Sequence, residues 1–239
     1  MICSGYCLSA RIENTVMKKS RLVYFVLMAL SSCAFASYHL EIETVPVGNA
    51  GNVPDPATMY GAVDYEYRIG KFEVTNEEYA KFLNAAAAFS DPYKLYNTKM
   101  AESYGGIERS GEEGNYSYSV RVVDGVNRGS WPVNWVTLYN AARFCNWLTT
   151  GDTESGVYTL TGGDFSRNED AWLAGGAALP TVDEWYKAAY YNAALDDGSY
   201  FKYSTSGDVL RTNEVNYSAS GFGNVTDVFF GAPTSTSDK

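Results

Sequence analysis

Histidine and cysteine are scarce in this sequence. It contains one histidine, His39, and four cysteines, of which Cys3, Cys7 and Cys33 lie close to the N-terminus. A single histidine excludes a metal centre built from two or three histidines of one chain. It also leaves no histidine on a stable scaffold for a Ser-His-Asp or Cys-His catalytic device. We expect His39 to be a solvated residue near the start of the mature chain.

A long apolar run is missing as well, because a membrane-spanning helix needs about 20 apolar residues. The apolar run at 22–30 is shorter; it follows three basic residues at 18–21 and precedes Ala34-Phe35-Ala36. This order is typical of a secretory signal peptide. We therefore predict a signal over residues 1–36, cleaved after its last alanine, and no membrane span. Residues 1–16 are interpreted as an over-long start.

The same segment supports an alternative form of export. Residues 30–33, Leu-Ser-Ser-Cys, resemble a bacterial lipoprotein box in which Cys33 would carry the lipid. The cleavage site just downstream favours plain cleavage over a lipid anchor. Both alternatives predict a secreted, periplasmic or cell-surface protein.

The remainder of the chain, residues 37–239, is predicted to be one acidic domain. The full sequence has 18 basic and 28 acidic residues. Removing residues 1–36 takes away four basic residues and one acidic residue, which leaves 14 against 27, a net charge of −13. Such a surface repels nucleic acid and anionic lipid, so neither is an expected partner.

Cys145 is the one cysteine outside the predicted signal. An intrachain disulfide is then excluded, and the domain must rest on a hydrophobic core. With 20 Tyr, 11 Phe and 5 Trp in the sequence, that core should be aromatic, and tyrosines should also cover the surface.

Three short helices are predicted from their capping residues. Thr75-Asn76-Glu77-Glu78 and Thr181-Val182-Asp183-Glu184 form capping boxes, in which the threonine hydroxyl and the glutamate carboxylate satisfy each other's backbone amides. Thr137 starts a helix that Gly151 ends. In the helix after Thr181, Trp185 and the two alanines at 188–189 supply the apolar residues.

Strands and long loops connect these helices. Residues 41–45, 65–74 and 116–122 are predicted strands. The stretches 91–128 and 151–176 are long and rich in Gly, Ser, Asn and Asp, which indicates function or additional structure. The pattern predicts an α+β fold with little regular secondary structure.

Three phrases in fixed order carry a family resemblance: YRIGKFEVTNEEYAKFLN from Tyr67, WPVNWVTLYNAARFCNWL from Trp131 and ALPTVDEWYKAAYY from Ala178. Together they resemble the formylglycine-generating (sulfatase-modifying factor) family, over roughly residues 41–232. The resemblance implies a fold related to C-type lectins. The third phrase departs from the commoner family form RLPTEAEWE and is similar to an exported bacterial subgroup.

The resemblance also implies an activity, the oxidation of a sulfatase cysteine to formylglycine with O₂ and copper. Family sequences continue from the third phrase into GNVWEW-like and RGGS-like stretches that carry the active-site cysteines, whereas this chain ends at Lys239 without them. We therefore expect a C-terminally truncated domain, with no catalytic residues and no cofactor in this chain. Copper is implied for intact catalytic relatives only.

Two partner classes remain open. The chain is a fragment-like relative that acts with a sulfatase or another exported protein, or it is a non-catalytic, lectin-like module that binds a glycan or a protein at the cell surface. The iron-dependent sulfoxide synthases that share this domain rely on a histidine set, so this branch is disfavoured.

Individual candidates for chemistry have structural interpretations. Cys145 lies on the apolar stripe of its helix and is predicted to be a buried small hydrophobe, and a single cysteine cannot supply the two thiolates that hold Cu(I). Glu73 and Glu184 match residues typical of the family. We expect Glu184 to complete a helix cap and Glu73 to bind backbone near the first helix.

A calcium site is the one metal site that the resemblance suggests. Asn216, Tyr217 and Asp227 fall where the family chain passes near a calcium ion bound by oxygen ligands. Calcium takes six to eight oxygens, and only part of such a set is visible here. An ordinary loop is the favoured interpretation, with calcium as the alternative.

Overall fold

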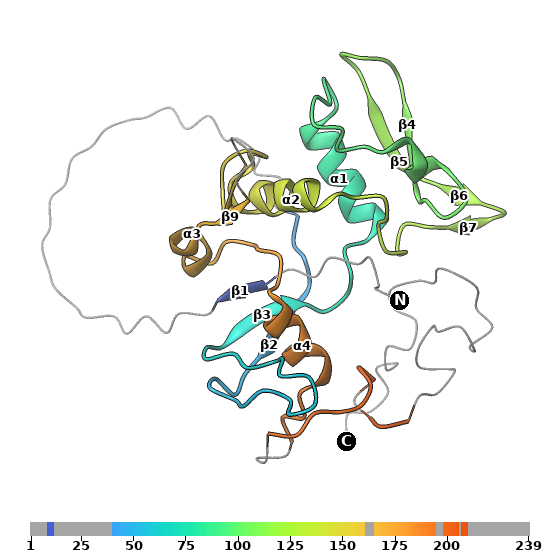
Figure 1. Ribbon diagram of the computed structural model, residues 1–239. Coiled ribbons are helices and arrows are strands. Elements are labelled where there is room, and N and C mark those ends of the chain that lie inside the picture. The colour runs from blue at the N-terminus through green and yellow to red at the C-terminus, as the bar shows by residue number, and fades with distance from the viewer. Residues whose placement is uncertain (1–8, 12–39, 161–164, 195–197, 206, 210–239) are drawn as a thin grey trace, which may run out of the picture.

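The computed structural model describes residues 9–11, 40–160, 165–194, 198–205 and 207–209 (Figure 1). Its architecture is α+β, with helices and several short strands, as the sequence predicts. Helices α1 and α2 lie side by side with the β4–β5 hairpin near α1, whereas α4 lies beside β2 and β3 (Figure 1). None of the helices in the described residues is long and apolar enough to span a membrane.

The largest sheet has three antiparallel strands in the order β1-β3-β2. Strand β3 (Tyr67–Gly70) lies between β2 (Thr44–Val47) and β1 (Ser9–Arg11), and Ile69 pairs with Val45 on one side and with Ser9 on the other. Strand β1 belongs to the predicted signal segment. Strands β2 and β3 pair over four residues of their own, so this part of the sheet does not depend on β1.

Both predicted capping boxes are confirmed. Helix α1 (Asn76–Ala86) begins after Thr75, whose hydroxyl accepts from the Glu78 amide at 3.2 Å while the Glu78 carboxylate accepts from the Thr75 amide at 2.7 Å. Helix α4 (Val182–Tyr190) begins after Thr181 in the same way. The reciprocal bonds satisfy amides that the first helical turn leaves unpaired, so each box fixes a helix start.

The boundaries of the middle helix are also confirmed. Helix α2 (Leu138–Thr150) begins at the Thr137 cap, whose hydroxyl accepts from the Asn140 amide at 3.2 Å. It ends at Gly151, which adopts the left-handed conformation with φ = 83°. Glycine reaches this conformation without a steric penalty, so the helix stops there.

Two shorter helical segments were not predicted. Helix α3 (Glu169–Leu173) is capped by Asn168, and the 3₁₀ turn η1 (Thr98–Ala101) is capped by Asn97. Each spans about one turn, which is too short to give a recognisable hydrophobic period.

The long stretches predicted as loops contain three hairpins. These are β4 (Ile107–Ser110) with β5 (Ser117–Val120), β6 (Val122–Val123) with β7 (Val126–Asn127), and β8 (Tyr158–Thr159) with β9 (Ser166–Arg167). The predicted strand at 116–122 is therefore split between two hairpins. Asp124 and Gly125 join β6 to β7 with φ values of 52° and 79°, as a two-residue hairpin turn requires.

The predicted aromatic core lies between α1 and α2. Phe82 is fully buried, and its ring centroid lies 5.3 Å from that of Tyr79, 5.2 Å from that of Phe144 and 5.3 Å from that of Trp147. Edge-to-face and tilted contacts at these distances add to the free energy gained by burial. A smaller cluster of Val63, Tyr67 and Ile69 lies under the three-stranded sheet.

Candidate functional site

Helix α4 is oriented opposite to an ordinary surface helix. Its fully buried side chains are charged, Glu184 and Lys187, whereas Val182 is 60 % exposed and Trp185 is 43 % exposed. Surface helices usually bury the apolar stripe and expose the charges. The sequence-based assignment of Trp185 to the buried face is therefore wrong, and the question is what holds the charges inside.

Glu184 is held by partners from distant parts of the chain. Its Oε1 accepts from the Tyr65 hydroxyl at 2.7 Å and lies 3.5 Å from Arg167 Nη2, and its backbone carbonyl accepts from the Tyr67 hydroxyl. Burial, and then the contact with Glu184, raise the pKa of Tyr65. A buried carboxylate is tolerated only when it is paired and hydrogen-bonded in this way. The structural interpretation of Glu184 is confirmed.

Lys187 connects α4 to the loop at 48–63. Its Nζ donates to the carbonyl of Asn49 at 2.9 Å and lies 3.5 Å from the carbonyl of Val63. Burial lowers the pKa of Lys187, because the protein interior disfavours the ammonium. The lysine thus fixes this loop against α4.

The loop is fixed at a second point by tyrosine hydroxyls. Tyr186 donates to Asp55 at 2.6 Å, and Tyr200 donates to the carbonyl of Gly61 at 3.0 Å and accepts from Asn52 Nδ2 at 2.8 Å. Gly61 has φ = 91°, and a Cβ there would lie 2.7 Å from the Tyr200 hydroxyl. Only glycine fits this close approach.

These contacts create an exposed cluster of rings, here called the aromatic face. It comprises Tyr60, Trp185, Tyr186, Tyr190, Tyr191 and Tyr200. The centroids of Tyr186 and Tyr190 lie 4.7 Å apart and those of Tyr186 and Tyr200 lie 5.7 Å apart. Tyr60 is 49 % exposed.

Ionisation does not alter the aromatic face at ordinary pH. Burial, followed by the hydrogen bond to Asp55, raises the pKa of Tyr186, and burial raises that of Tyr200 to about 12. Both rings therefore stay neutral and keep their hydroxyls bonded to the loop. Because their orientation is fixed before a partner arrives, little conformational entropy is lost on binding.

Cys145 lies where the sequence predicts, inside the core. It is the one cysteine of the described residues, it is fully buried, and burial raises the pKa of its thiol. A thiol in this setting is neither a nucleophile nor an open metal ligand. Copper(I) held by thiolates needs two accessible sulfur ligands, so this residue does not fit the copper of catalytic relatives.

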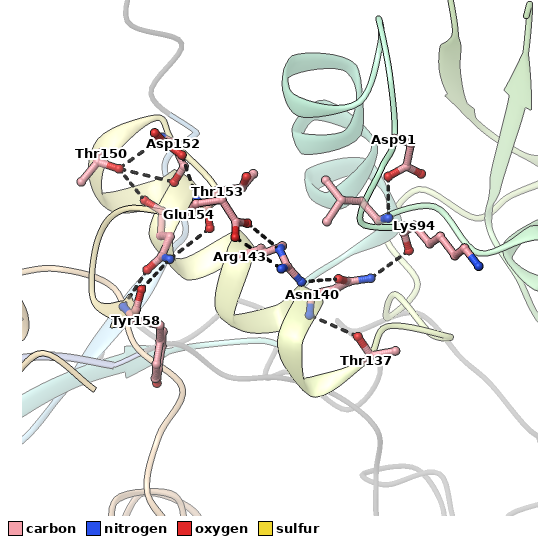
Figure 2. Close-up of polar contacts among 12 residues, drawn as sticks. Asp91, Lys94, Thr137, Asn140, Arg143, Thr150, Asp152, Thr153, Glu154 and Tyr158 are labelled. Atoms are coloured by element: carbon pink, nitrogen blue, oxygen red, sulfur yellow. Dashed lines mark hydrogen bonds and ion pairs between the residues drawn. The ribbon is translucent and has the colours of Figure 1, made fainter. Parts of the chain in front are cut away.

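The other polar cluster of α2 serves the scaffold. Arg143 donates to Glu154 at 2.6 Å, and Asn140 donates to the carbonyl of Lys94 at 2.9 Å, as Figure 2 shows. Asn146, fully buried, bonds the backbone of both Thr153 and Tyr158. These groups satisfy one another, so the network connects α2 to its flanking loops and offers no open site.

Glu73 does not make its predicted backbone contact. The structure gives its carboxylate no hydrogen bond among the described residues, and burial raises its pKa. The half-buried carboxylate therefore has no structural role in capping the first helix, a task that Glu78 performs instead.

The predicted calcium ligands Asn216, Tyr217 and Asp227 lie outside the described residues. Within the described ranges, no group of three or more His, Cys, Asp or Glu side chains is placed to hold a metal ion.

The aromatic face was missed at the sequence level, although a signal for it exists. Val182, Trp185, Tyr186 and Tyr190 recur at helical spacing, while Glu184 and Lys187 lie on the opposite side of the helix. The pattern was visible, but sequence alone does not decide which side faces the core.

Comparison with known families agrees with the three phrases. The family model for the sulfatase-modifying factor enzyme 1-like domain matches residues 45–229. Searches of curated proteins and of solved structures gave no match. The family match covers most of the chain, including β2, β3 and all four α-helices. The chain therefore belongs to the formylglycine-generating, sulfatase-modifying factor family.

Proposed function

We propose that this chain is an exported, polypeptide-binding member of its family, and that it contacts its partner through the aromatic face. The observation that carries the proposal is the inverted orientation of α4, which turns Val182 and Trp185 outward while it buries Glu184 and Lys187. Burying two charged side chains is costly, and exposing apolar ones gains nothing in an isolated domain. A partner that covers the exposed side would explain the arrangement.

The residue types of the aromatic face suit a protein partner. Trp and Tyr are enriched at the centres of protein interfaces, where they supply most of the binding free energy. Met59 and Val53, which are 69 % and 58 % exposed, extend the apolar surface along the loop that Lys187 fixes. A contiguous apolar surface of this kind is typical of an interaction site.

The partner class follows from family and export. Members of the family act on sulfatase polypeptides, so a sulfatase or another exported protein is the proposed partner. The predicted signal over residues 1–36 supports an encounter outside the cytoplasm. The relation of the fold to C-type lectins, and the lectin-like alternative in which the ligand is a glycan, remain predictions.

Formylglycine formation by this chain is not part of the proposal. The donor set does not fit copper, because Cys145 is the one cysteine outside the predicted signal and its thiol is enclosed by the core. We propose that the chain recognises its partner without oxidising it. Mass spectrometry of a sulfatase-derived cysteine peptide, incubated with the purified chain, copper and O₂, should show no conversion to formylglycine.

Binding is tested with the purified mature chain and a labelled, unfolded sulfatase polypeptide. Fluorescence anisotropy should show saturable binding that Trp185→Ala weakens at least tenfold. Val126→Ala is the matched control, because Val126 is 49 % exposed on strand β7, away from α4. Equal binding by both variants would rule out the aromatic face. A glycan array that gave Trp185-dependent binding, with no affinity for polypeptide, would replace the proposal with the lectin-like alternative.

A further inference from the structure

We propose a second binding site, around Trp135, for a sugar that carries a carboxylate or sulfate group. The site, here called the Trp135 surface, comprises Lys99, Tyr104, Asn134, Trp135, Leu138 and Tyr139. It shares no residue with the aromatic face. It adjoins the start of α2, which lies beside α1, whereas α4 lies beside β2 and β3 (Figure 1).

The backbone presents the Trp135 ring to solvent. Trp135 has φ = 62°, in the left-handed region that bulky residues rarely adopt, and its side chain is 43 % exposed. A strained backbone at an exposed aromatic residue is a feature of binding sites rather than of plain scaffold. Relaxing it would need only a glycine, so the tryptophan is retained against a local steric penalty.

A cation lies directly on this ring. Lys99 Nζ is 4.7 Å from the centroid of the Trp135 ring. Among the described residues no carboxylate lies within ion-pair distance of Lys99, although the chain as a whole is acidic. The first turn of α2 also holds no acidic residue. The ammonium is therefore available to a negatively charged group of a ligand.

A buried acceptor beside the ring is also available. Asn134 Nδ2 donates to the Tyr104 carbonyl at 2.8 Å, whereas its Oδ1 is buried and has no hydrogen-bond partner among the described residues. Buried acceptors are rarely left unpaired without a reason. A hydroxyl donor from a ligand next to Trp135 would satisfy it.

The surrounding rings favour a sugar over an acidic peptide. Tyr104 and Tyr139 are 49 % and 42 % exposed, and Leu138 is 49 % exposed, so they form an open surface without a deep pocket. Peptide anchors usually insert into pockets. A flat pyranose ring can lie its C–H face on a half-open aromatic ring, give a hydroxyl to Asn134 and place its anionic substituent at Lys99.

The test uses isothermal titration of the mature chain with polygalacturonate, heparin and dextran. Polygalacturonate offers carboxylates, heparin adds sulfates and dextran is neutral. We expect binding of at least one anionic polymer, with its identity showing which anionic group is preferred, and at least tenfold weaker binding of dextran. Trp135→Ala should weaken anionic binding at least tenfold, and Lys99→Gln at least threefold with a reduced salt dependence.

The controls separate this site from the aromatic face and from an acidic peptide site. Trp185→Ala should bind the anionic polymer like the parent, so loss of polypeptide binding and loss of glycan binding are independent results. Circular dichroism checks that Trp135→Ala is folded, and Lys99→Gln supplies a second test if it is not. Equal binding of dextran, unchanged binding by both variants, or tighter binding of polyglutamate than of either glycan would overturn the proposal.

Discussion

Helices α2 and α4 begin with the same device and then diverge. Each follows a threonine cap, yet α2 buries Phe144 and Trp147 in the core whereas α4 buries Glu184 and Lys187 and exposes Trp185. The cap fixes where a helix starts but not which side faces inward. The inward side of α2 is decided by apolar area, and that of α4 by specific polar partners in distant segments.

Substitutions of buried and exposed rings should show this difference most strongly. Phe82→Ala removes a fully buried ring against α2 and should destabilise the fold by about 3–5 kcal/mol. Trp185→Ala removes a ring of similar chemistry from the aromatic face and should cost less than about 1 kcal/mol. Urea unfolding of both variants measures the contrast. A loss of stability in Trp185→Ala as large as that in Phe82→Ala would show that the aromatic face is part of the core.

The polar interior of α4 should respond to the loss of one partner. Glu184→Ala leaves Arg167 without its buried carboxylate and removes half of the capping box, so we expect a loss of about 3 kcal/mol. Glu184→Gln keeps an acceptor for the Thr181 amide and should lose less. Thermal melts of the two variants would contradict this account if glutamine were as damaging as alanine.

The shared caps should behave alike in spite of the different interiors. Thr75→Ala and Thr181→Ala each remove the acceptor for a first-turn amide and should each destabilise by about 1 kcal/mol. Serine at either position keeps the hydroxyl and serves as the control. If the melting curves of both alanine variants overlaid that of the parent, the boxes would have no energetic role.

High pH should affect the side of α4 that carries the tyrosines. The pKa of Tyr200 is raised from 10.0 to about 12, so its contribution to stability is complete below pH 10 and is lost as the pH rises toward 12. Tyr200→Phe removes this contribution, so the variant should be less stable than the parent at pH 8, and the difference should shrink above pH 10. Denaturant unfolding at several pH values tests the trend; a difference independent of pH would contradict it.

What could be predicted from the sequence depends on how local each feature is. A capping box joins residues three apart, so Thr75 with Glu78 identified a helix start without any knowledge of the fold. The hairpins of the long stretches have strands of two to four residues, too short for a periodic signal. The burial of Glu184 depends on Tyr65, 119 residues away, and no local pattern contains that information.

The same reasoning applies to function. The three phrases identified the family, because their residues build the helices and the β3 strand that the family shares. The aromatic face and the Trp135 surface arise from exposure and ring packing between separate segments. Such surfaces depend on how loops fold onto helices, which composition and spacing do not reveal.

The burial of Cys145 turns its thiol into an internal reporter of motion. A thiol-specific reagent cannot reach a fully buried side chain, so labelling of the mature chain has to wait for α2 to separate from the core. When reclosing is fast compared with labelling, the labelling rate measures the equilibrium population of that opened state. A ligand that binds only the closed domain should therefore slow the modification of Cys145 in proportion to its occupancy, whichever surface it occupies.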